Sequence, residues 1–145
     1  MDIFTWLGEL AIQTDCGLLL DAGHVVSHQF SMGRRHGELL FGLNDLPLER
    51  VIEIHVAGGT ISEKNDKLYY GDAHDLPIIP ETMQVFRALL SRCPNLRAVC
   101  LECEGTITQS ILPMIQTIRS LVSRVSINPE LIEKTSHSLR KAAAT

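Results

Sequence analysis

The 145-residue sequence predicts an α/β fold, and more specifically half of a TIM-type (β/α) barrel with about four parallel strands and covering helices. Short, largely apolar runs alternate with segments of helical periodicity, as expected for successive strand–helix units. Runs of this kind suit strands that are buried in a parallel sheet. Four strands are too few to close the usual eight-stranded barrel, so we expect a half-barrel that forms a single domain over residues 1–145.

Four strands are expected, and each ends near an acid, a histidine or both. They cover residues 16–21, 51–57, about 68–72 and about 97–102. Gly58 and Gly59 are expected to end the second strand, and the mostly polar residues 60–67 are expected to form a loop. The sheet therefore brings ionisable groups to the carboxyl ends of its strands, where parallel sheets place ligand sites.

Helices are expected between and around the strands. They cover residues 2–14, about 81–92, and a stretch that begins near residue 108 or 110. Asp2 can cap the first helix, and Pro80 suits the first turn of the second. Asn128 and Pro129 predict the start of a further helix. Residues 27–45 are mixed, with a possible helical turn over 39–43.

The alternation of side chains along a strand separates polar from aliphatic residues. In the second strand Glu53 and His55 share one face, whereas Ile52, Ile54 and Val56 are expected to face the covering helices. In the fourth strand Glu102 shares a face with Cys100 and Ala98. A barrel with a polar site at its mouth requires such a separation.

Six residues at the strand ends are candidate metal ligands. They are Asp21, His24, His55, Asp72, His74 and Glu102. Four of them have a structural alternative: Asp21 can cap a helix, His55 can be a hydrogen-bonded core residue, and Asp72 and His74 can belong to a turn. A buried carboxylate such as that of Glu102 needs a partner. Imidazole and carboxylate together suit iron, manganese and zinc.

Cysteine spacing adds a competing interpretation. Cys100 and Cys103 form a Cys-x-x-Cys pair, but residues three apart in a strand point to opposite faces, so we do not expect them to chelate one ion together. Four cysteines without secretory features predict free thiols in a reducing cytoplasm. The net charge of -4 argues against nonspecific nucleic-acid binding, and no apolar stretch approaches the length of a membrane span.

Four segments of the chain resemble the multinuclear non-heme iron-dependent oxidative enzymes, which include the methanobactin-biosynthesis oxidase. The segments are Leu18-Leu19-Leu20-Asp21, Leu48-Glu49-Arg50-Val51-Ile52-Glu53-Ile54-His55-Val56-Ala57-Gly58, Gly71-Asp72-Ala73-His74-Asp75-Leu76-Pro77 and Leu101-Glu102-Cys103-Glu104. Their order and spacing resemble the C-terminal half of the family's barrel, from the first helix to about Val125.

The resemblance implies a TIM barrel that holds two or three iron ions and uses dioxygen to modify cysteines of ribosomally made peptides. The chain differs from the family pattern where Gly23 and His24 replace two asparagines, and where Gly59 replaces a second histidine. The family's N-terminal half and its remaining ligands have no counterpart in these 145 residues. We therefore expect at most one tightly bound ion for this chain alone.

The resemblance further implies partners: an N-terminal half-barrel or a homodimer mate, a peptide substrate, and a small peptide-recognising protein. Two other functions stay open at this point. One is a noncatalytic remnant or partner-binding scaffold that keeps the strand pattern for packing. The other is a mononuclear metal hydrolase or isomerase on a related barrel.

Overall fold

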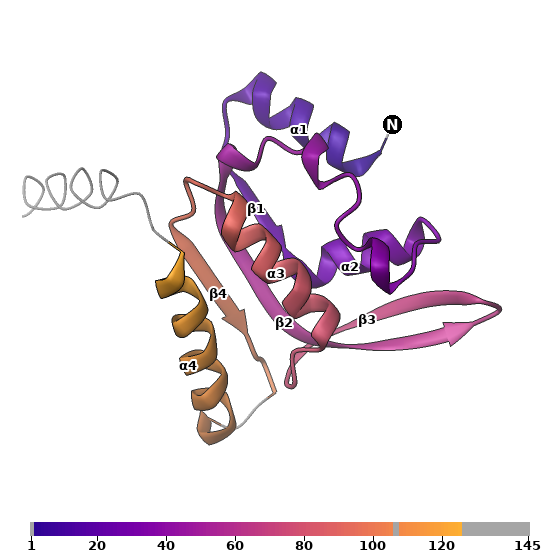
Figure 1. Ribbon diagram of the computed structural model, residues 1–145, viewed down its shortest axis with the longest axis vertical. Coiled ribbons are helices and arrows are strands. Elements are labelled where there is room, and N and C mark those ends of the chain that lie inside the picture. Colours follow the sequence, from indigo (N-terminus) through magenta and orange to yellow (C-terminus); the bar gives the residue numbers. More distant parts are fainter. Residues whose placement is uncertain (1, 106–107, 126–145) are drawn as a thin grey trace, which may run out of the picture.

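A computed structural model describes residues 2–105 and 108–125 of the chain, and it shows a sheet with helices packed against it (Figure 1). The helices are α1 (Ile3–Thr14), α2 (Ala22–Ser31), α3 (Pro80–Arg92) and α4 (Thr108–Arg124), and the strands are β1 (Leu18–Asp21), β2 (Val51–Lys64), β3 (Lys67–Asp75) and β4 (Ala98–Glu102). Three short 3₁₀ helices, His36–Glu38, Leu43–Asp45 and Leu48–Arg50, lie between α2 and β2. The helix start predicted at Asn128 and Pro129 lies outside the described residues.

The predicted α/β fold with a parallel sheet is confirmed. Strand β2 lies at the centre and pairs in parallel with β1 on one side and with β4 on the other. Asp21 pairs with His55, and His55 pairs with Cys100, so these three residues lie side by side across the sheet. With its helices, this sheet is consistent with part of a TIM-type barrel.

The third strand does not belong to the parallel set, which corrects the expected count of about four parallel strands. Strand β3 runs antiparallel to the second half of β2 and forms a hairpin that projects beyond the parallel sheet (Figure 1). Residues 60–67 are thus strand and turn instead of loop. Asn65 and Asp66 form the two-residue connection with φ values of 52° and 59°. Positive φ at both positions matches the right-handed twist of a hairpin.

Gly58 and Gly59 do not end β2, but they interrupt its pairing. Gly58 pairs with Asp75 and Gly59 pairs with Asp72, so Ala73 and His74 form a bulge in β3. A Cβ on Gly58 would lie 1.9 Å from the carbonyl oxygen of Asp75, and only glycine permits this approach. His74 takes a φ of 44°, which is uncommon for a residue other than glycine. The bulge therefore sets the direction of the His74 side chain.

Helix α2 begins at Ala22, directly after β1. The sequence did not predict this helix, and its last residues fall in the stretch 27–45 that was expected to have mixed structure. Asp21 caps this helix, because its Oδ1 accepts a hydrogen bond of 2.8 Å from the backbone N–H of His24. The apolar face of α2 is buried against the sheet through Val25, Val26 and Phe30. The cap and the apolar face together fix His24 in the first helical turn, at the carboxyl end of β1.

The core lies between the sheet and the helices. Ile54 and Val56 of β2 are fully buried there, as predicted, and pack with residues such as Phe86 of α3. Ile52 does not face the core and is 38% exposed. The pairing of β1 with β2 shifts between Leu18 and Leu19, and this irregularity lies at Ile52. Such a bulge breaks the alternation of side chains.

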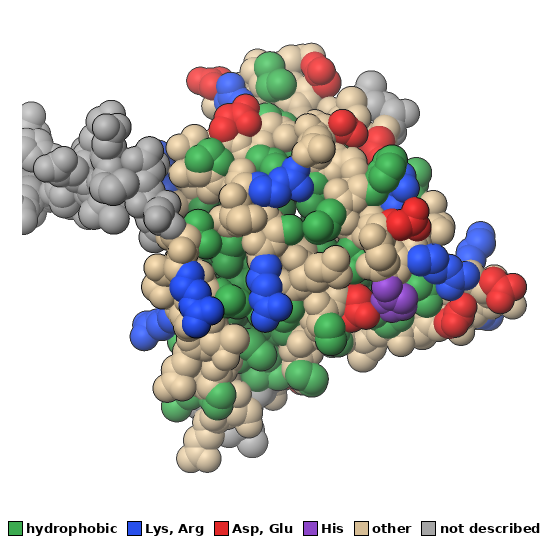
Figure 2. Space-filling model, viewed as in Figure 1, with side chains coloured by type: hydrophobic (Ala, Val, Ile, Leu, Met, Phe, Trp, Pro, Cys, Tyr) green, Lys and Arg blue, Asp and Glu red, His purple; other side chains and the backbone are tan. Residues whose placement is uncertain are grey.

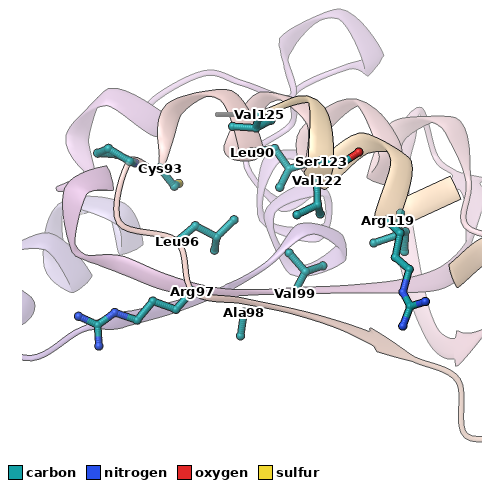
Figure 3. Close-up of a pocket in the computed structure, with 12 residues that line it drawn as sticks. Leu90, Cys93, Leu96, Arg97, Ala98, Val99, Arg119, Val122, Ser123 and Val125 are labelled. Atoms are coloured by element: carbon teal, nitrogen blue, oxygen red, sulfur yellow. The ribbon is translucent and has the colours of Figure 1, made fainter. Parts of the chain in front are cut away.

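An apolar groove of about 400 Å³ lies between the end of α3, strand β4 and helix α4 (Figure 3). Its lining includes Leu96, Val99 and Val122, together with Arg97 and Arg119. Figure 2 shows the surface of the molecule on the side of α3 and α4, where apolar side chains lie between separated basic side chains. The described residues of the lining include no histidine or carboxylate, so the groove is separate from the candidate metal centre. Among the described residues, no helix combines the length and apolar character needed to cross a membrane.

Candidate metal centre

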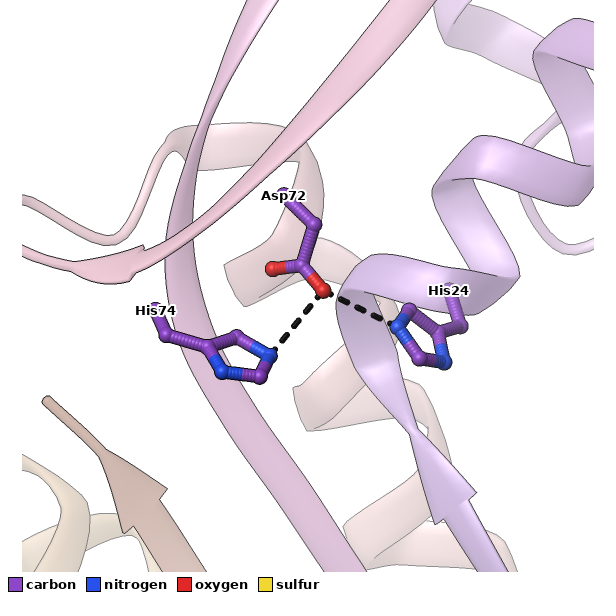
Figure 4. A group of neighbouring side chains, drawn as sticks. All are labelled: His24, Asp72 and His74. Atoms are coloured by element: carbon purple, nitrogen blue, oxygen red, sulfur yellow. Dashed lines mark hydrogen bonds and ion pairs between the residues drawn. The ribbon is translucent and has the colours of Figure 1, made fainter. Parts of the chain in front are cut away.

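His24, Asp72 and His74 form the first group of possible metal ligands, which we call the hairpin trio (Figure 4). Asp72 Oδ2 lies 3.0 Å from Nε2 of His24 and 3.0 Å from Nε2 of His74. One carboxylate oxygen therefore faces two imidazole nitrogens, one from α2 and one from the bulge of β3. One ligand atom from each residue lies within 4.8 Å of the others, so the three can reach a common ion.

His55, Cys100 and Glu102 form the second group, which we call the sheet trio. His55 Nδ1 lies 2.9 Å from Glu102 Oε1, and the ligand atoms of all three residues lie within 4.8 Å of one another. Glu53 Oε1 lies 3.0 Å from the other ring nitrogen of His55, Nε2. A carboxylate placed in this way fixes the ring orientation of a metal-binding histidine.

Glu102 connects the two trios. Its Oε1 faces His55, and its Oε2 lies 3.6 Å from His74 Nε2. Glu104 supports His74 from the other side, because its Oε1 lies 3.3 Å from His74 Nδ1 and its backbone N–H donates to the His74 carbonyl oxygen at 2.8 Å. The last residue of β4 is therefore a possible ligand, and Glu104, two residues beyond the strand, orients a neighbouring ligand.

Acidic neighbours raise the pKa of both central histidines above the ordinary 6.5. For His74 the main cause is the hydrogen bond with Glu104, followed by the charge of Asp72. For His55 the largest single effect is burial, which lowers the pKa, but the hydrogen bonds and charges of Glu53 and Glu102 together outweigh it. The carboxylates that raise these pKa values also supply the negative charge that attracts a metal cation.

Five of the six predicted ligands lie in the two trios: His24 in the hairpin trio with Asp72 and His74, and His55 in the sheet trio with Glu102. Asp21 lies in neither, and its Oδ1 caps α2. Cys100 was not predicted as a ligand. The signal that could have identified it is the alternation of β4, which places Cys100 on the face of Glu102.

The donor set fits a transition metal. The hairpin trio offers two imidazoles and a carboxylate, and the sheet trio offers an imidazole, a carboxylate and a thiol. Divalent ions such as iron, manganese and zinc accept these donors. All side chains in the trios are at least partly exposed, so an ion and a substrate can reach them.

A sequence profile of the RiPP precursor modification enzymes MbnB/TglH/ChrH matches residues 1–133. The chain belongs to this family. RiPPs are ribosomally synthesised, post-translationally modified peptides, so the predicted relationship to a family of peptide-modifying enzymes is confirmed. Membership implies the use of a metal, for which the two trios provide the donors.

Two curated relatives match part of the chain. A UPF0276 protein of Rhizobium meliloti is 35% identical over 86 residues, which are 58% of this chain and 26% of the relative. A UPF0276 protein of Acaryochloris marina is 33% identical over 88 residues, which are 60% of this chain and 29% of the relative. The matched part of the chain thus spans less than a third of each relative's length.

Proposed function

We propose that this chain is the metal-binding part of an iron-dependent enzyme that oxidises cysteines of ribosomally made peptides. The observation that carries the proposal is the convergence of the hairpin trio and the sheet trio around Glu102, in a member of a family of RiPP precursor modification enzymes. Iron is the proposed metal because the imidazole and carboxylate donors suit it. When bound, iron would supply the binding and reduction of dioxygen.

The residues of the chain would hold and orient this centre. Glu53 fixes the ring of His55, and Glu104 fixes the ring of His74, so that both imidazoles stay directed toward Glu102. His24 is the most accessible ligand, with a side chain that is 66% exposed. A peptide thiol can therefore approach from the side of α2 without displacing the buried part of the sheet.

We further propose that another chain completes the site. Strands β1 and β4 each pair only with β2 among the described residues, so both sides of the parallel sheet are open to further strands. An N-terminal half-barrel or a second copy of this chain would add strands and ligands there. A small peptide-recognising protein is the proposed further partner, and a reducing cytoplasm suits the four free cysteines.

The test is anaerobic reconstitution of the chain with ferrous iron, followed by dioxygen and a cysteine-containing peptide. We expect iron to bind and the lone chain to leave the peptide unmodified. Adding the N-terminal half of the Rhizobium meliloti relative should produce oxidised peptide, detected by mass spectrometry. A chain that binds no transition metal would contradict the proposal and favour a noncatalytic scaffold. A single redox-inert ion with hydrolase or isomerase activity would contradict the assignment of iron and oxidation.

A further inference from the structure

We propose that Cys100 is a thiolate ligand for a second metal ion, which it would bind together with His55 and Glu102 of the sheet trio. This inference rests on the metal-binding part of the proposed function, but it requires neither iron nor peptide oxidation. It assigns one ion to the sheet trio and leaves the hairpin trio complete for another. It thereby raises the expected capacity of the chain from one ion to two.

The pairing of β2 with β4 carries the inference. His55 and Cys100 are partners in the parallel register, and Ala57 is the partner of Glu102. Paired residues on neighbouring strands project to the same face, and so do residues two apart on one strand. The three ligand atoms consequently lie within 4.8 Å of one another, on rigid strands instead of loops.

The hydrogen bonds of His55 hold its ring in an orientation that suits metal binding. Nε2 faces Glu53 Oε1 at 3.0 Å, so it can donate its proton there, which leaves Nδ1 free to bind an ion. Nδ1 faces Glu102 Oε1 at 2.9 Å, so the two atoms border the same position, which a cation could take with a small separation of the pair. Cys100 would bind the ion as a thiolate, so binding would release the proton of the thiol.

Cys93 and Cys103 lie in different surroundings from Cys100. Cys93 is buried and lines the apolar groove beside Leu90 and Leu96. Cys103 follows the end of β4 and lies in neither trio. Cys100 instead lies on the polar face of the sheet, beside His55 and two residues before Glu102. Apolar packing accounts for Cys93 but not for this position.

The thiolate also determines the class of metal. Sulfur donors favour zinc and other ions of borderline or soft character, whereas the hairpin trio offers only nitrogen and oxygen donors. With three protein ligands, the sheet trio would leave a coordination position for water or a substrate thiol. The two trios should therefore differ in metal preference.

The experiment is a titration of the full, reduced chain with cobalt(II) in the absence of oxygen. Cobalt bound to a thiolate gives a near-ultraviolet charge-transfer band, and cobalt bound to nitrogen and oxygen alone does not. We expect this band and close to two bound ions in the wild-type chain. Cys100→Ser should abolish the band and retain one ion, while Cys103→Ser should retain both ions and the band.

Asp72→Asn completes the design, because it should remove the ion of the hairpin trio and leave the band intact. Circular dichroism of each variant verifies that it is folded, and Cys100→Ala serves as a second variant if the serine itself binds cobalt. Cobalt binding without the band, or a band that persists in Cys100→Ala, would overturn the inference while metal binding by the chain stands. Failure of the wild-type chain to bind any cobalt would overturn this inference and the proposed function together.

Discussion

The Tyr70 hydroxyl lies so close to Gly59 that a Cβ on Gly59 would be 2.3 Å from it. The same hydroxyl would be 2.5 Å from a Cβ on Gly23. The tyrosine therefore fits between α2 and β2 only because both neighbours are glycine. Tyr70 lies two residues before Asp72 on β3, so its position helps to fix the strand that carries Asp72 and His74.

Gly59→Ala is expected to lower the free energy of unfolding by about 1–3 kcal/mol, because the added methyl group must displace the Tyr70 ring. It should also weaken metal binding at the hairpin trio, since β3 must shift with Tyr70. Thermal unfolding and a metal titration measure the two effects. Gly37→Ala is the matched control, because a Cβ at Gly37 would meet no atom within 4 Å. Equal stability of the two variants would show that Tyr70 is not tightly held.

Substitution of His55 and His74 together by alanine should abolish transition-metal binding, because it removes one imidazole from each trio. Metal content after anaerobic purification is the measurement. His36→Ala is the control, since His36 pairs with Glu81 and belongs to neither trio. An unchanged metal content in the double variant would rule out the centre as described.

Metal affinity should fall as the pH decreases through the raised pKa values of His55 and His74, beginning above pH 6.5. An imidazolium must lose its proton before it can bind an ion, so the proton competes with the metal. Glu104→Gln removes the main cause of the raised pKa of His74 and should shift this loss to lower pH. Calorimetric titrations at several pH values, with Glu9→Gln as the control, test this. Identical pH profiles for the wild-type chain and the Glu104 variant would contradict it.

The chain is expected to form a dimer or a complex, because unpaired strand edges recruit further strands. In the described part of the chain, β1 and β4 both have such an edge. Leu19 of β1 is 50% exposed on the face that it shares with Glu53. Multi-angle light scattering measures the mass in solution. A dispersed monomer at high concentration would show that the sheet edges are protected by other means.

The sequence predicted the parallel sheet well and the hairpin poorly, for a physical reason. Strands β1 and β2 are recognisable because burial demands apolar side chains such as those of Leu20, Ile54 and Val56. The hairpin is largely exposed, and Ser62, Lys64 and Lys67 resemble loop residues because solvent tolerates them on a strand. Its turn, Asn65-Asp66, lacks the glycine that makes a two-residue turn easy to identify.

The candidate site was predictable to the extent that strand alternation determines it. His55 and Glu102 follow from the faces of β2 and β4, and the structure brings them within 2.9 Å. His24 could be placed only beside Asp21, because the start of α2 was not recognised. The direction of His74 depends on the bulge opposite Gly58 and Gly59, and no local pattern announces such a shift in register.

The two trios also have a consequence for chain topology. His24 and Asp72 lie 48 positions apart, and the loop that they would close overlaps in sequence with the loop from His55 to Cys100. Ions in both trios would therefore act as interlaced cross-links that restrict the unfolded chain. If the lost chain entropy is calculated as for a disulfide, each ion would stabilise the folded state by about 3–5 kcal/mol. Neither loop could open fully while the other stayed closed. Chelation would then release the whole stretch from α2 to β4 as one cooperative unit.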